Sequence, residues 1–283
     1  MFKKFIRKIR KNPLEVIIKK AKRKNKKRFL LCWNRGLGDI PLGLYAICKK
    51  IKENIANAKI TFLIREDLKE GFYLFKEADF IIAKGWERGI FYKLPNLNGF
   101  DIIIKNPDPN YWVKWQIGKI TPKLNWKNSL DNLYEKFNLT EKDYIGVQVI
   151  SDTTHSPWRD WPQYKWESFF KKIKNKKIII FGKKIDKKFD FSNILDLRGK
   201  TSFLDVLSII KNRCSKVVLP DGGILSILYY LDIDFPIKII SLWCDIQGIL
   251  KQNVSSPNKK LIHIPIYKKT MDDIKVEEVL KYL

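Results

Sequence analysis

The residues most able to do chemistry lie in three short turns, and the first of these follows an apolar run at 29–33. Glycines in this turn let the backbone bend tightly and approach a ligand, and the helix expected next offers free N–H groups to an anion. Its aspartate has two interpretations: it caps the helix, or its carboxylate takes part in a reaction. Local physics alone favours the cap. The polar and glycine residues of this turn are Asn34, Arg35, Gly36, Gly38 and Asp39.

The second turn is a polar loop at 151–166, SDTTHSPWRDWPQYKW, after another apolar run. A guanidinium together with hydroxyl groups suits a diphosphate, and this loop holds Arg159, Thr153 and Thr154. The alternative is a surface loop that its Trp-Pro pair holds in place. The third turn, Asp221-Gly222-Gly223, lies between a predicted strand and a predicted helix, where backbone N–H groups can face an anion.

Other constellations of reactive residues are sparse. The chain has only two histidines, His155 and His263, and its four cysteines show no CxxC or Cys/His spacing. We therefore expect reduced thiols, no metal site and no cofactor. An Asp-Ile-Asp stretch at 232–234 has the spacing of a metal-binding DxD motif, but a simple loop is the favoured interpretation.

Strand-like and helix-like patterns alternate along most of the chain, and these elements must position the turns. Short apolar strands that alternate with amphipathic helices predict parallel, doubly wound sheets. We expect an α/β fold with two Rossmann-like domains facing a cleft, with ligands outside the carboxyl ends of the strands. The predicted strands are 29–33, 59–64, 80–83, 102–104, 144–150, 177–181, 194–197, 216–219 and 237–242. The predicted helices are 40–54, 67–76, 129–137, 164–172, 203–211, 223–231 and one within 271–283.

Domain boundaries are predicted from composition. A stretch rich in Pro, Asn and Trp at 106–126 reads as a loop, and the strand–helix pattern restarts near residue 142. We expect a first domain at 29–141 and a second domain at 142–283. The last helix is expected either to stay with the second domain or to pack back on the first.

The segment 1–28 forms a basic leader. It holds 14 Lys or Arg residues and one acid, in a chain of net charge +26. Apolar residues recur at helical spacing twice, which favours amphipathic helices on an anionic membrane surface. A solvated tail or a helix packed on the body is the alternative. The two apolar sets are Phe2, Phe5, Ile6 and Ile9, followed by Leu14, Ile17, Ile18 and Ala21.

Localisation and other partners follow from the same composition. No apolar run reaches the roughly 20 residues that span a bilayer, and the leader does not resemble a signal peptide. We expect a cytoplasmic protein, either free or peripheral on the inner face of the cytoplasmic membrane. Nucleic acid is a weaker candidate partner, because no helix-turn-helix, zinc or RNP pattern accompanies the charge.

Taken in order, the motifs resemble the heptosyltransferases of glycosyltransferase family 9. The resemblance runs from about residue 28 to the end through NRGLGDIPLGLYAI, WRDWPQYKW, IIIFGKKID, DLRGKTSFLDVLSIIKNRCSKVVLPDGG and MDDIKVEEVL. It implies the two-domain B-type glycosyltransferase fold, with 29–141 as the acceptor-side domain and 142–283 as the nucleotide-sugar-binding domain. It also implies metal-independent, inverting transfer of a sugar, such as heptose, from a nucleotide diphosphate sugar to a lipopolysaccharide or other surface-glycan acceptor.

The resemblance also assigns roles to residues. Asp39 corresponds to the general base of the family, and Arg159 to the basic residue that stabilises the leaving diphosphate. At two positions the chain departs from the family: Gly222 replaces a Ser or Thr, and Ser226 replaces a His that contacts phosphate. A non-catalytic nucleotide- or glycan-binding protein is therefore the alternative function. The other donor-site correspondences are Thr153, Thr154, Asp221, Gly222, Gly223 and Ser226 for the diphosphate and Asp186 for the nucleoside.

Overall fold

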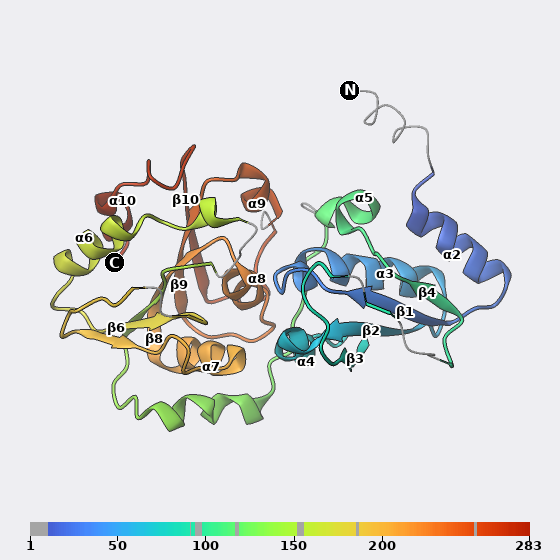
Figure 1. The fold of residues 1–283 in the computed structure, drawn as a ribbon, viewed down its shortest axis with the longest axis horizontal. Helices are drawn as coiled ribbons and strands as arrows, with labels where there is room; N and C mark the ends of the chain where they lie inside the picture. The colour runs from blue at the N-terminus through green and yellow to red at the C-terminus, as the bar shows by residue number, and fades with distance from the viewer. Residues whose placement is uncertain are drawn as a thin grey trace. The chain divides into compact units, whose positions relative to one another are not determined.

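The computed structural model describes residues 11–90, 92–93, 98–116, 119–151, 156–184, 187–251 and 254–283. The chain divides into two compact units, Met1–Gln116 and Ile117–Leu283 (Figure 1). Each unit contains one sheet in which every strand pair is parallel. The α/β class expected from the alternating pattern is confirmed.

The first unit is built on a four-stranded sheet of order β3-β2-β1-β4. Central strand β1 pairs with β2 on one side and with β4 on the other. Its last five residues are buried, as expected for a strand covered on both faces. The elements are α2 (Pro13–Arg23), β1 (Arg28–Trp33), η1 (Ile40–Leu44), α3 (Tyr45–Asn54), β2 (Lys59–Arg65), η2 (Glu66–Leu68), α4 (Lys69–Tyr73), β3 (Asp79–Ala83), β4 (Ile102–Ile104), α5 (Pro109–Val113) and η3 (Lys114–Gln116).

The two faces of this sheet are covered differently. On one face, aromatic contacts link β2 to α4 and α3: the Phe62 and Phe72 rings lie 5.1 Å apart, and Phe75 lies 6.3 Å from Tyr45. On the other face, Leu30 and its neighbours pack against Trp86, Tyr92 and Phe100. This face therefore lacks the helical cover of a doubly wound sheet within the described residues.

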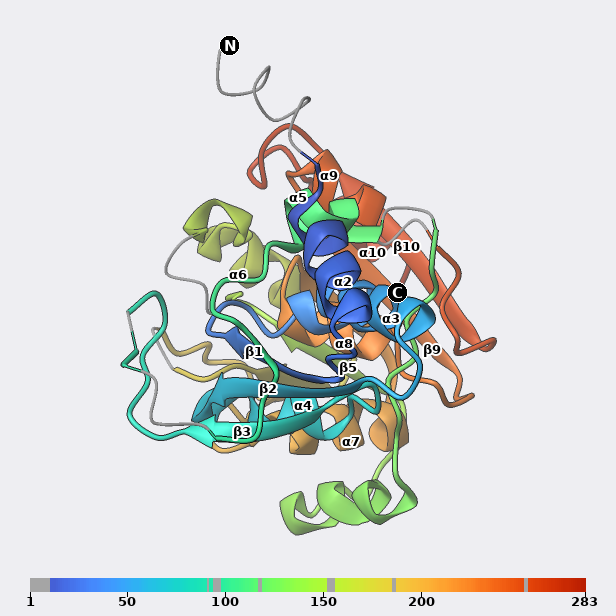
Figure 2. The same cartoon turned by 90° about the vertical axis from the view of Figure 1, so that its right-hand side faces the viewer.

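Helix α2 of the leader packs on the first unit beside α3 (Figures 1 and 2). Asn12 caps it, accepting a hydrogen bond of 3.0 Å from the Leu14 N–H. Leu14, Ile18 and Ala21 are buried, and Glu15 forms an ion pair of 2.7 Å with Lys50 of α3. The apolar stripe predicted to meet a membrane is thus occupied by the protein body. The first apolar set of the leader lies outside the described residues.

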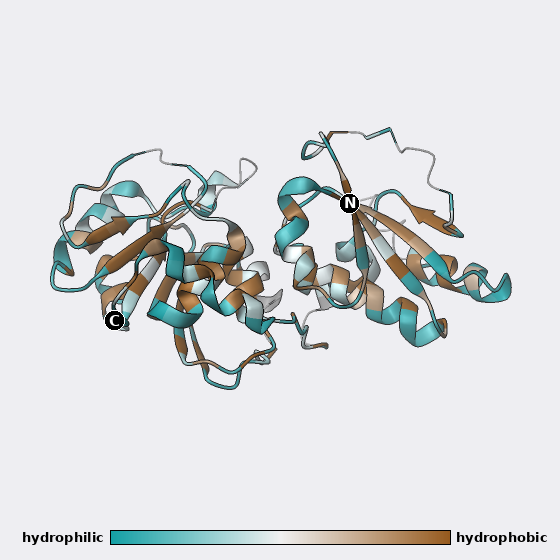
Figure 3. Cartoon of the chain, turned by 90° about the horizontal axis from the view of Figure 1, so that it is seen from below, coloured by the Kyte–Doolittle hydropathy of each residue, from teal (hydrophilic) through white to brown (hydrophobic). Residues whose placement is uncertain are grey.

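The second unit is built on a six-stranded sheet of order β10-β9-β8-β5-β6-β7. Brown, hydrophobic stretches run along the strands of both sheets in Figure 3, as the burial of their residues requires. The elements are η4 (Asn128–Phe137), β5 (Tyr144–Gln148), η5 (Pro157–Arg159), α6 (Gln163–Lys172), β6 (Ile178–Phe181), β7 (Ile194–Asp196), α7 (Phe203–Arg213), β8 (Cys214–Pro220), α8 (Gly223–Tyr229), β9 (Ile237–Trp243), α9 (Ile246–Lys251), β10 (Leu261–Tyr267) and α10 (Val276–Leu280).

Helices cover both faces of the larger sheet. Alternate residues of β5, such as Val147, join a core with aromatic residues of α6 and with Val276 and Val279 of α10. Helices α7 and α8 contact β8 of the same sheet. The last helix, for which packing on the first domain was one expectation, packs on α6 of its own unit.

The boundary between the units lies earlier than the composition suggested. Residues 119–137, predicted within the first domain, are held on the second unit through side chains of α7. The Ser208 hydroxyl donates to the Asp131 carbonyl at 2.9 Å, and Lys211 pairs with the Asp131 carboxylate at 2.6 Å. Leu124 is fully buried beside the end of α8, where its N–H donates to the Tyr230 carbonyl at 2.9 Å. A loop-like composition therefore concealed tertiary anchoring.

Strand β10 was not predicted, because its sequence LIHIPIY is interrupted by Pro265. The strand lies at the edge of the sheet, where a residue without an N–H is tolerated. The short helices α5 and α9 were also missed. The predicted helix 40–54 begins as the π-helical turn η1 before it continues as α3.

Candidate functional site

Both sheets place a predicted turn where the order of the strands reverses. After β1 the chain builds outward through β2 and β3, and then returns to the other side of β1 with β4. After β5 it builds outward through β6 and β7, and then returns with β8. Ligands of open parallel sheets bind outside the carboxyl ends of the strands at such points. The turn at 34–39 follows β1, and the turns at 149–162 and 221–223 follow β5 and β8.

In the first turn, Asp39 does not cap the following helix with its side chain. Asp39 does hold the N-cap position that was predicted, but with helical backbone angles (φ −71°, ψ −16°) where a capping residue is usually extended, so the predicted position is confirmed and the capping hydrogen bond is absent. Instead, Asp39 Oδ2 accepts a hydrogen bond of 3.1 Å from the Gly36 N–H. A β-carbon on Gly36 would lie 3.2 Å from that same oxygen, so glycine gives the carboxylate its room.

A buried arginine that the sequence patterns did not single out supports this turn. Arg65, at the end of β2, is 5% exposed and donates Nη1 to the carbonyl oxygens of Asn34 and, at 3.3 Å, Arg35. Its other edge makes two bonds of 2.8 Å with the Asp67 carboxylate. The fork geometry of a guanidinium allows it to serve both partners at once. The buried Arg65 guanidinium therefore holds the backbone of Asn34 and Arg35, in the same turn as Asp39.

Close packing fixes the other sides of the first turn. A β-carbon on Gly71 of α4 would lie 2.5 Å from the Leu37 side chain, and one on Gly43 of η1 would lie 2.4 Å from Pro109. Contacts this short exclude any larger residue at either glycine unless the neighbours move. The turn therefore packs against α4, and η1, which follows the turn, packs against α5.

The remaining side chains of the turn reach outward. Arg35 is exposed, and its guanidinium carbon lies 5.6 Å from the centre of the Trp33 ring. The Asn34 amide donates to the Ile90 carbonyl at 3.2 Å. Arg35 is exposed and Asp39 is half-buried, and a cation and a carboxylate in one turn can orient and deprotonate a hydroxylated molecule.

In the second unit, the structure brings two of the predicted turns together. Arg159 Nη1 lies 2.9 Å from Asp221 Oδ2, which joins the loop after β5 to the turn after β8. The two side chains are 26% and 15% exposed, so the guanidinium is held in place and still open on one side. Gly222 is extended and Gly223 begins α8. This arrangement suits an anion such as a diphosphate.

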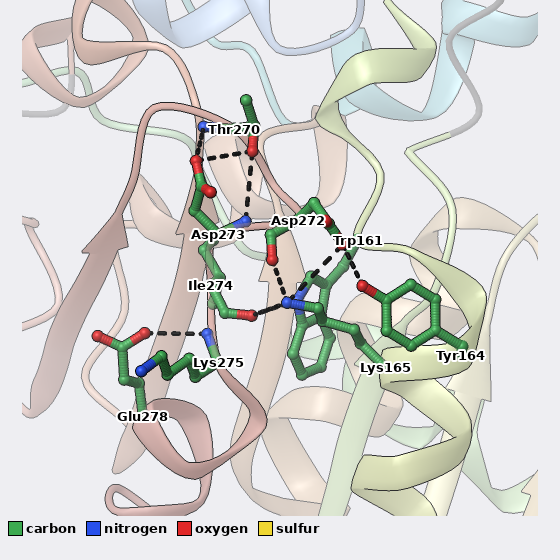
Figure 4. A network of polar contacts seen from close by, with 9 residues as sticks. All are labelled: Trp161, Tyr164, Lys165, Thr270, Asp272, Asp273, Ile274, Lys275 and Glu278. Atoms are coloured by element: carbon green, nitrogen blue, oxygen red, sulfur yellow. Dashed lines mark hydrogen bonds and ion pairs between the residues drawn. The ribbon is translucent and has the colours of Figure 1, made fainter.

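The loop that carries Arg159 is braced by the C-terminal segment (Figure 4). The Trp161 indole donates to the Ile274 carbonyl at 3.1 Å, and Lys165 donates to the same oxygen at 2.9 Å. Trp161 is 2% exposed and stacks edge-on with Trp166 at 4.8 Å. The Trp-Pro pair therefore stiffens the loop, and two distant motifs, WRDWPQYKW and MDDIKVEEVL, act as one structural feature.

The motif DLRGKTS has a structural role in the same unit. Arg198 is 2% exposed, makes bonds of 2.6 Å and 2.9 Å to Asp196, and donates at 2.7 Å to the Lys187 carbonyl. These contacts hold the carboxyl end of β7 against the loop after β6. Arg198 lowers the pKa of the Asp196 carboxyl, opposing the effect of burial. The predicted nucleoside contact, Asp186, belongs to this loop but lies outside the described residues.

Three buried polar atoms near the Arg159 turn have no hydrogen-bond partner: Gln148 Oε1, Ser151 Oγ and Arg159 Nε. Only two other side-chain atoms in the described part of the chain share this condition. Buried polar atoms are usually paired, so a concentration of unpaired ones next to a candidate anion site is informative. Neither Gln148 nor Ser151 was predicted, because single glutamine and serine residues carry no motif.

The other predicted residues are placed as follows. Ser226, which stands where the family has His, is 2% exposed inside α8 and presents little surface to a ligand. Thr153, Thr154 and His155 lie outside the described residues. Asp232 pairs with Lys123 at 3.3 Å, and Asp234 accepts from the Lys259 N–H at 2.7 Å. Both carboxylates of the DxD-like stretch therefore have partners within the protein.

The second histidine belongs to a buried polar chain. The Trp243 indole donates to Ser241 Oγ at 2.6 Å, and that hydroxyl lies 2.7 Å from His263 Nε2. Burial lowers the pKa of His263 to about 4, which keeps the ring neutral at pH 7. Ser241 is fully buried, so this serine–histidine pair cannot reach a substrate. In the described ranges, no group of three potential metal ligands occurs.

Comparison with known proteins gave structural matches alone. No family model and no curated protein sequence matches the chain. A family 9 glycosyltransferase from Veillonella parvula aligns with a TM-score of 0.61 at 14% identity, covering 90% of this chain and 95% of that one. E. coli ADP-heptose lipopolysaccharide heptosyltransferase II aligns with a TM-score of 0.61 at 13% identity, covering 90% and 97%. E. coli heptosyltransferase WaaC, solved with ADP, aligns with a TM-score of 0.53 at 13% identity, covering 90% and 98%.

These matches show that the chain has the fold of the family 9 heptosyltransferases over nine-tenths of its length. The expected B-type glycosyltransferase architecture is confirmed at the level of fold. At such identities the matches show the fold alone, since one fold hosts many activities.

Proposed function

We propose that the protein is a glycosyltransferase that moves a sugar from a nucleotide diphosphate sugar to a glycan acceptor, with inversion and without a metal ion. One observation carries the proposal: the candidate base of the first unit and the candidate diphosphate site of the second unit each occupy the switch point of their sheet. The similarity to structures of heptosyltransferases, one of them solved with ADP, supports this choice of reaction and donor.

Asp39 serves as the general base in this proposal. Its carboxylate takes the proton of an acceptor hydroxyl as that oxygen attacks the anomeric carbon of the donor. The hydrogen bond from Gly36 fixes one oxygen of the carboxylate, and Arg65 fixes the backbone of the turn. A positioned base of this kind contributes about 10²–10⁴-fold to a rate.

Arg159 stabilises the leaving nucleoside diphosphate. Asp221 holds the guanidinium at 2.9 Å, and the brace from the C-terminal segment fixes the loop. The guanidinium and the N–H groups at Gly222 and Gly223 face the charge that develops as the glycosidic bond breaks. The resemblance also assigns Thr153, Thr154 and Asp186 to donor binding. It suggests heptose as the transferred sugar and lipopolysaccharide as the acceptor.

Donor binding and transfer test this function together. Thermal shift with ADP-, GDP-, UDP- and dTDP-glucose, each with its parent diphosphate, identifies the nucleotide, and transfer is then measured in EDTA with glycan acceptors. We expect one nucleotide to bind and transfer to persist in EDTA. Binding without transfer would indicate the non-catalytic alternative, and no binding to any nucleotide would reject both functions.

The basic leader is proposed to bring this enzyme to an anionic membrane surface. Because the apolar face of α2 is buried against α3, the contact there is electrostatic. Among the described residues, no helix is both long and apolar enough to cross a bilayer. Each cation near an anionic surface contributes on the order of 1 kcal/mol. The exposed cations of this helix and its end are Lys19, Lys20, Lys22, Arg23 and Lys24.

Charge reversal tests this membrane contact without disturbing the fold. Deleting the whole leader would instead expose the apolar surface of the first unit that α2 covers. Changing Lys19, Lys20 and Arg23 to Glu should abolish sedimentation with phosphatidylglycerol vesicles. The matched control changes three exposed lysines of the second unit, Lys171, Lys174 and Lys176, to Glu. Equal binding by the two variants would reject a role for α2.

A further inference from the structure

The segment 243–248, which runs from the end of β9 into α9, begins with a buried tryptophan. Trp243 is 1% exposed, and its indole Nε1 donates to Ser241 Oγ at 2.6 Å. That hydroxyl lies 2.7 Å from His263 Nε2 on the neighbouring strand β10. Because the indole is both buried and hydrogen-bonded, it offers a fixed surface to the helix that follows.

Gly248 of α9 packs directly on this tryptophan. A β-carbon on Gly248 would lie 2.5 Å from Trp243 Cζ3 and 2.9 Å from Trp243 Cε3. Contacts this short exclude a larger residue unless the ring or the helix moves. Glycine is among the least favourable residues inside a helix, so the close approach of the ring explains its presence here. With six residues, α9 also depends on such packing for its position.

The same glycine faces the carboxylate that holds Arg159. A β-carbon on Gly248 would lie 3.2 Å from Asp221 Oδ2, the oxygen that pairs with Arg159 Nη1 at 2.9 Å. The Cys244 thiol, in the same segment, donates to the carbonyl of Trp158 at 3.3 Å, one residue before Arg159. This segment therefore reaches the carboxylate on one side and the backbone next to the guanidinium on the other.

We propose that Trp243 and Gly248 are positioning residues of the donor site. This inference rests on the proposed function, because both residues act through Arg159. The indole fixes the position of Gly248, and Gly248 closes one side of the Asp221 carboxylate. The Arg159 guanidinium is thereby held in one orientation before the donor binds, which lowers the cost of ordering it on binding. Neither residue acts on the donor directly.

Gly248→Ala tests the proposal. The added methyl group meets both the Trp243 ring and Asp221 Oδ2, so the carboxylate must shift and the Arg159 guanidinium with it. We expect the nucleoside diphosphate that the panel identifies to bind about tenfold more weakly in calorimetric titration, the effect of impairing one charged hydrogen bond.

A second glycine provides the matched control, which separates positioning from stability. Gly146 of β5 is packed almost as closely in the same unit, since a β-carbon there would lie 2.9 Å from Phe181 and 3.0 Å from Val217. Gly146→Ala should lower the melting temperature and leave the affinity of the folded protein for the nucleoside diphosphate unchanged. An equal loss of affinity in Gly146→Ala and Gly248→Ala would make the role of Gly248 merely structural and overturn the proposal.

Two double variants test whether the effect passes through Trp243 and Arg159. Trp243→Phe removes the far edge of the indole, so in Gly248→Ala/Trp243→Phe the helix can settle towards the smaller ring and most of the affinity should return. In Gly248→Ala/Arg159→Gln the guanidinium is absent, so affinity should be no weaker than in Arg159→Gln alone. A further tenfold loss there would show that Gly248 does not act through Arg159.

The remaining outcomes separate this inference from the proposed function. If the unmodified protein binds a nucleotide and Gly248→Ala binds it equally well, the inference is rejected and the proposed function stands. If Gly248→Ala does not fold, Trp243→Phe alone decides, because it loosens α9 and should also weaken diphosphate binding; unchanged affinity would reject the inference. If the unmodified protein binds no nucleotide of the panel, both are rejected.

Discussion

The turn after β1 and the turn after β8 share a pattern but hold their aspartates in opposite ways. Each joins a buried strand to a helix with glycine beside aspartate, and each lies at the switch point of a parallel sheet. Asp39 accepts a hydrogen bond from a neutral backbone N–H at 3.1 Å, whereas Asp221 lies 2.9 Å from the Arg159 guanidinium. The first arrangement presents a carboxylate that can take a proton. The second uses the carboxylate to hold a cation for an anionic ligand.

The polar groups next to the two turns also differ. A buried cation, Arg65, supports the first turn through its carbonyl oxygens and does not reach a ligand from there. Near the second turn, Gln148 Oε1, Ser151 Oγ and Arg159 Nε are unpaired. Local sequence therefore does not decide the role of an aspartate in such turns; the partners that the sheet brings to it do.

The largest effect is expected at Asp39. Asp39→Asn removes the proton acceptor and keeps the size of the side chain, so sugar transfer should fall about 10²–10⁴-fold while nucleotide-sugar affinity stays unchanged. Asp79→Asn is the matched control, since Asp79 is an exposed carboxylate at the first residue of β3 in the same sheet. Near-normal transfer by Asp39→Asn would remove the distinction between the two turns.

The next effect is expected at Arg159. Arg159→Gln removes a charged donor worth about 1.5–3 kcal/mol, so affinity for the nucleoside diphosphate should fall by about 10–100-fold in calorimetric titration. Lys187→Gln is the control, because Lys187 pairs with Glu167 on the surface of the same unit. Unchanged affinity in Arg159→Gln would mean that its pair with Asp221 is structural.

Arg65 tests whether the first turn needs its buried support. Arg65→Met should lower the free energy of unfolding of the first unit by about 2–3 kcal/mol, because two carbonyl oxygens and Asp67 lose their donor. It should also slow transfer while leaving nucleotide-sugar affinity intact, since the second turn is untouched. Arg28→Met, at a guanidinium that pairs with Asp101 and is 56% exposed, should change neither quantity appreciably.

The smallest effect concerns pH and the second unit. His263 lies 5.0 Å from the Tyr229 ring of α8, and burial lowers its pKa to about 4. The unfolded chain, with a pKa near 6.5, takes up the proton first as the pH falls, so stability present above pH 6.5 is lost between pH 6.5 and 4. Between pH 6.5 and 5 the loss should be about 2 kcal/mol.

Urea unfolding of the unmodified protein and of His263→Gln isolates this histidine from the carboxylates that titrate in the same range. The difference in free energy of unfolding between the two proteins should shrink as the pH falls from 6.5 to 5. A constant difference would show that His263 titrates normally.

Much of the architecture followed from sequence pattern because strands and helices bury residues at fixed periods. The strand at 102–104 was predicted with the bounds of β4, and most other strands to within one or two residues. Errors arose where tertiary contacts override local signals. Pro265 concealed β10, and neither the loop-like composition of 106–126 nor the helix predicted at 129–137 indicated that residues 119–137 attach to the second unit.

The sequence by itself predicted the two parallel sheets and the order of the turns, because apolar periodicity and glycine-rich strand ends have local physical causes, and its resemblance to a known family singled out Asp39 and Arg159 as candidates. Only the tertiary structure decided that the Asp39 side chain makes no capping hydrogen bond, that Arg65 supports its turn, and that Arg159 pairs with Asp221. These relations join residues far apart in the chain, and no local period or spacing records which strand ends meet at one edge of a sheet.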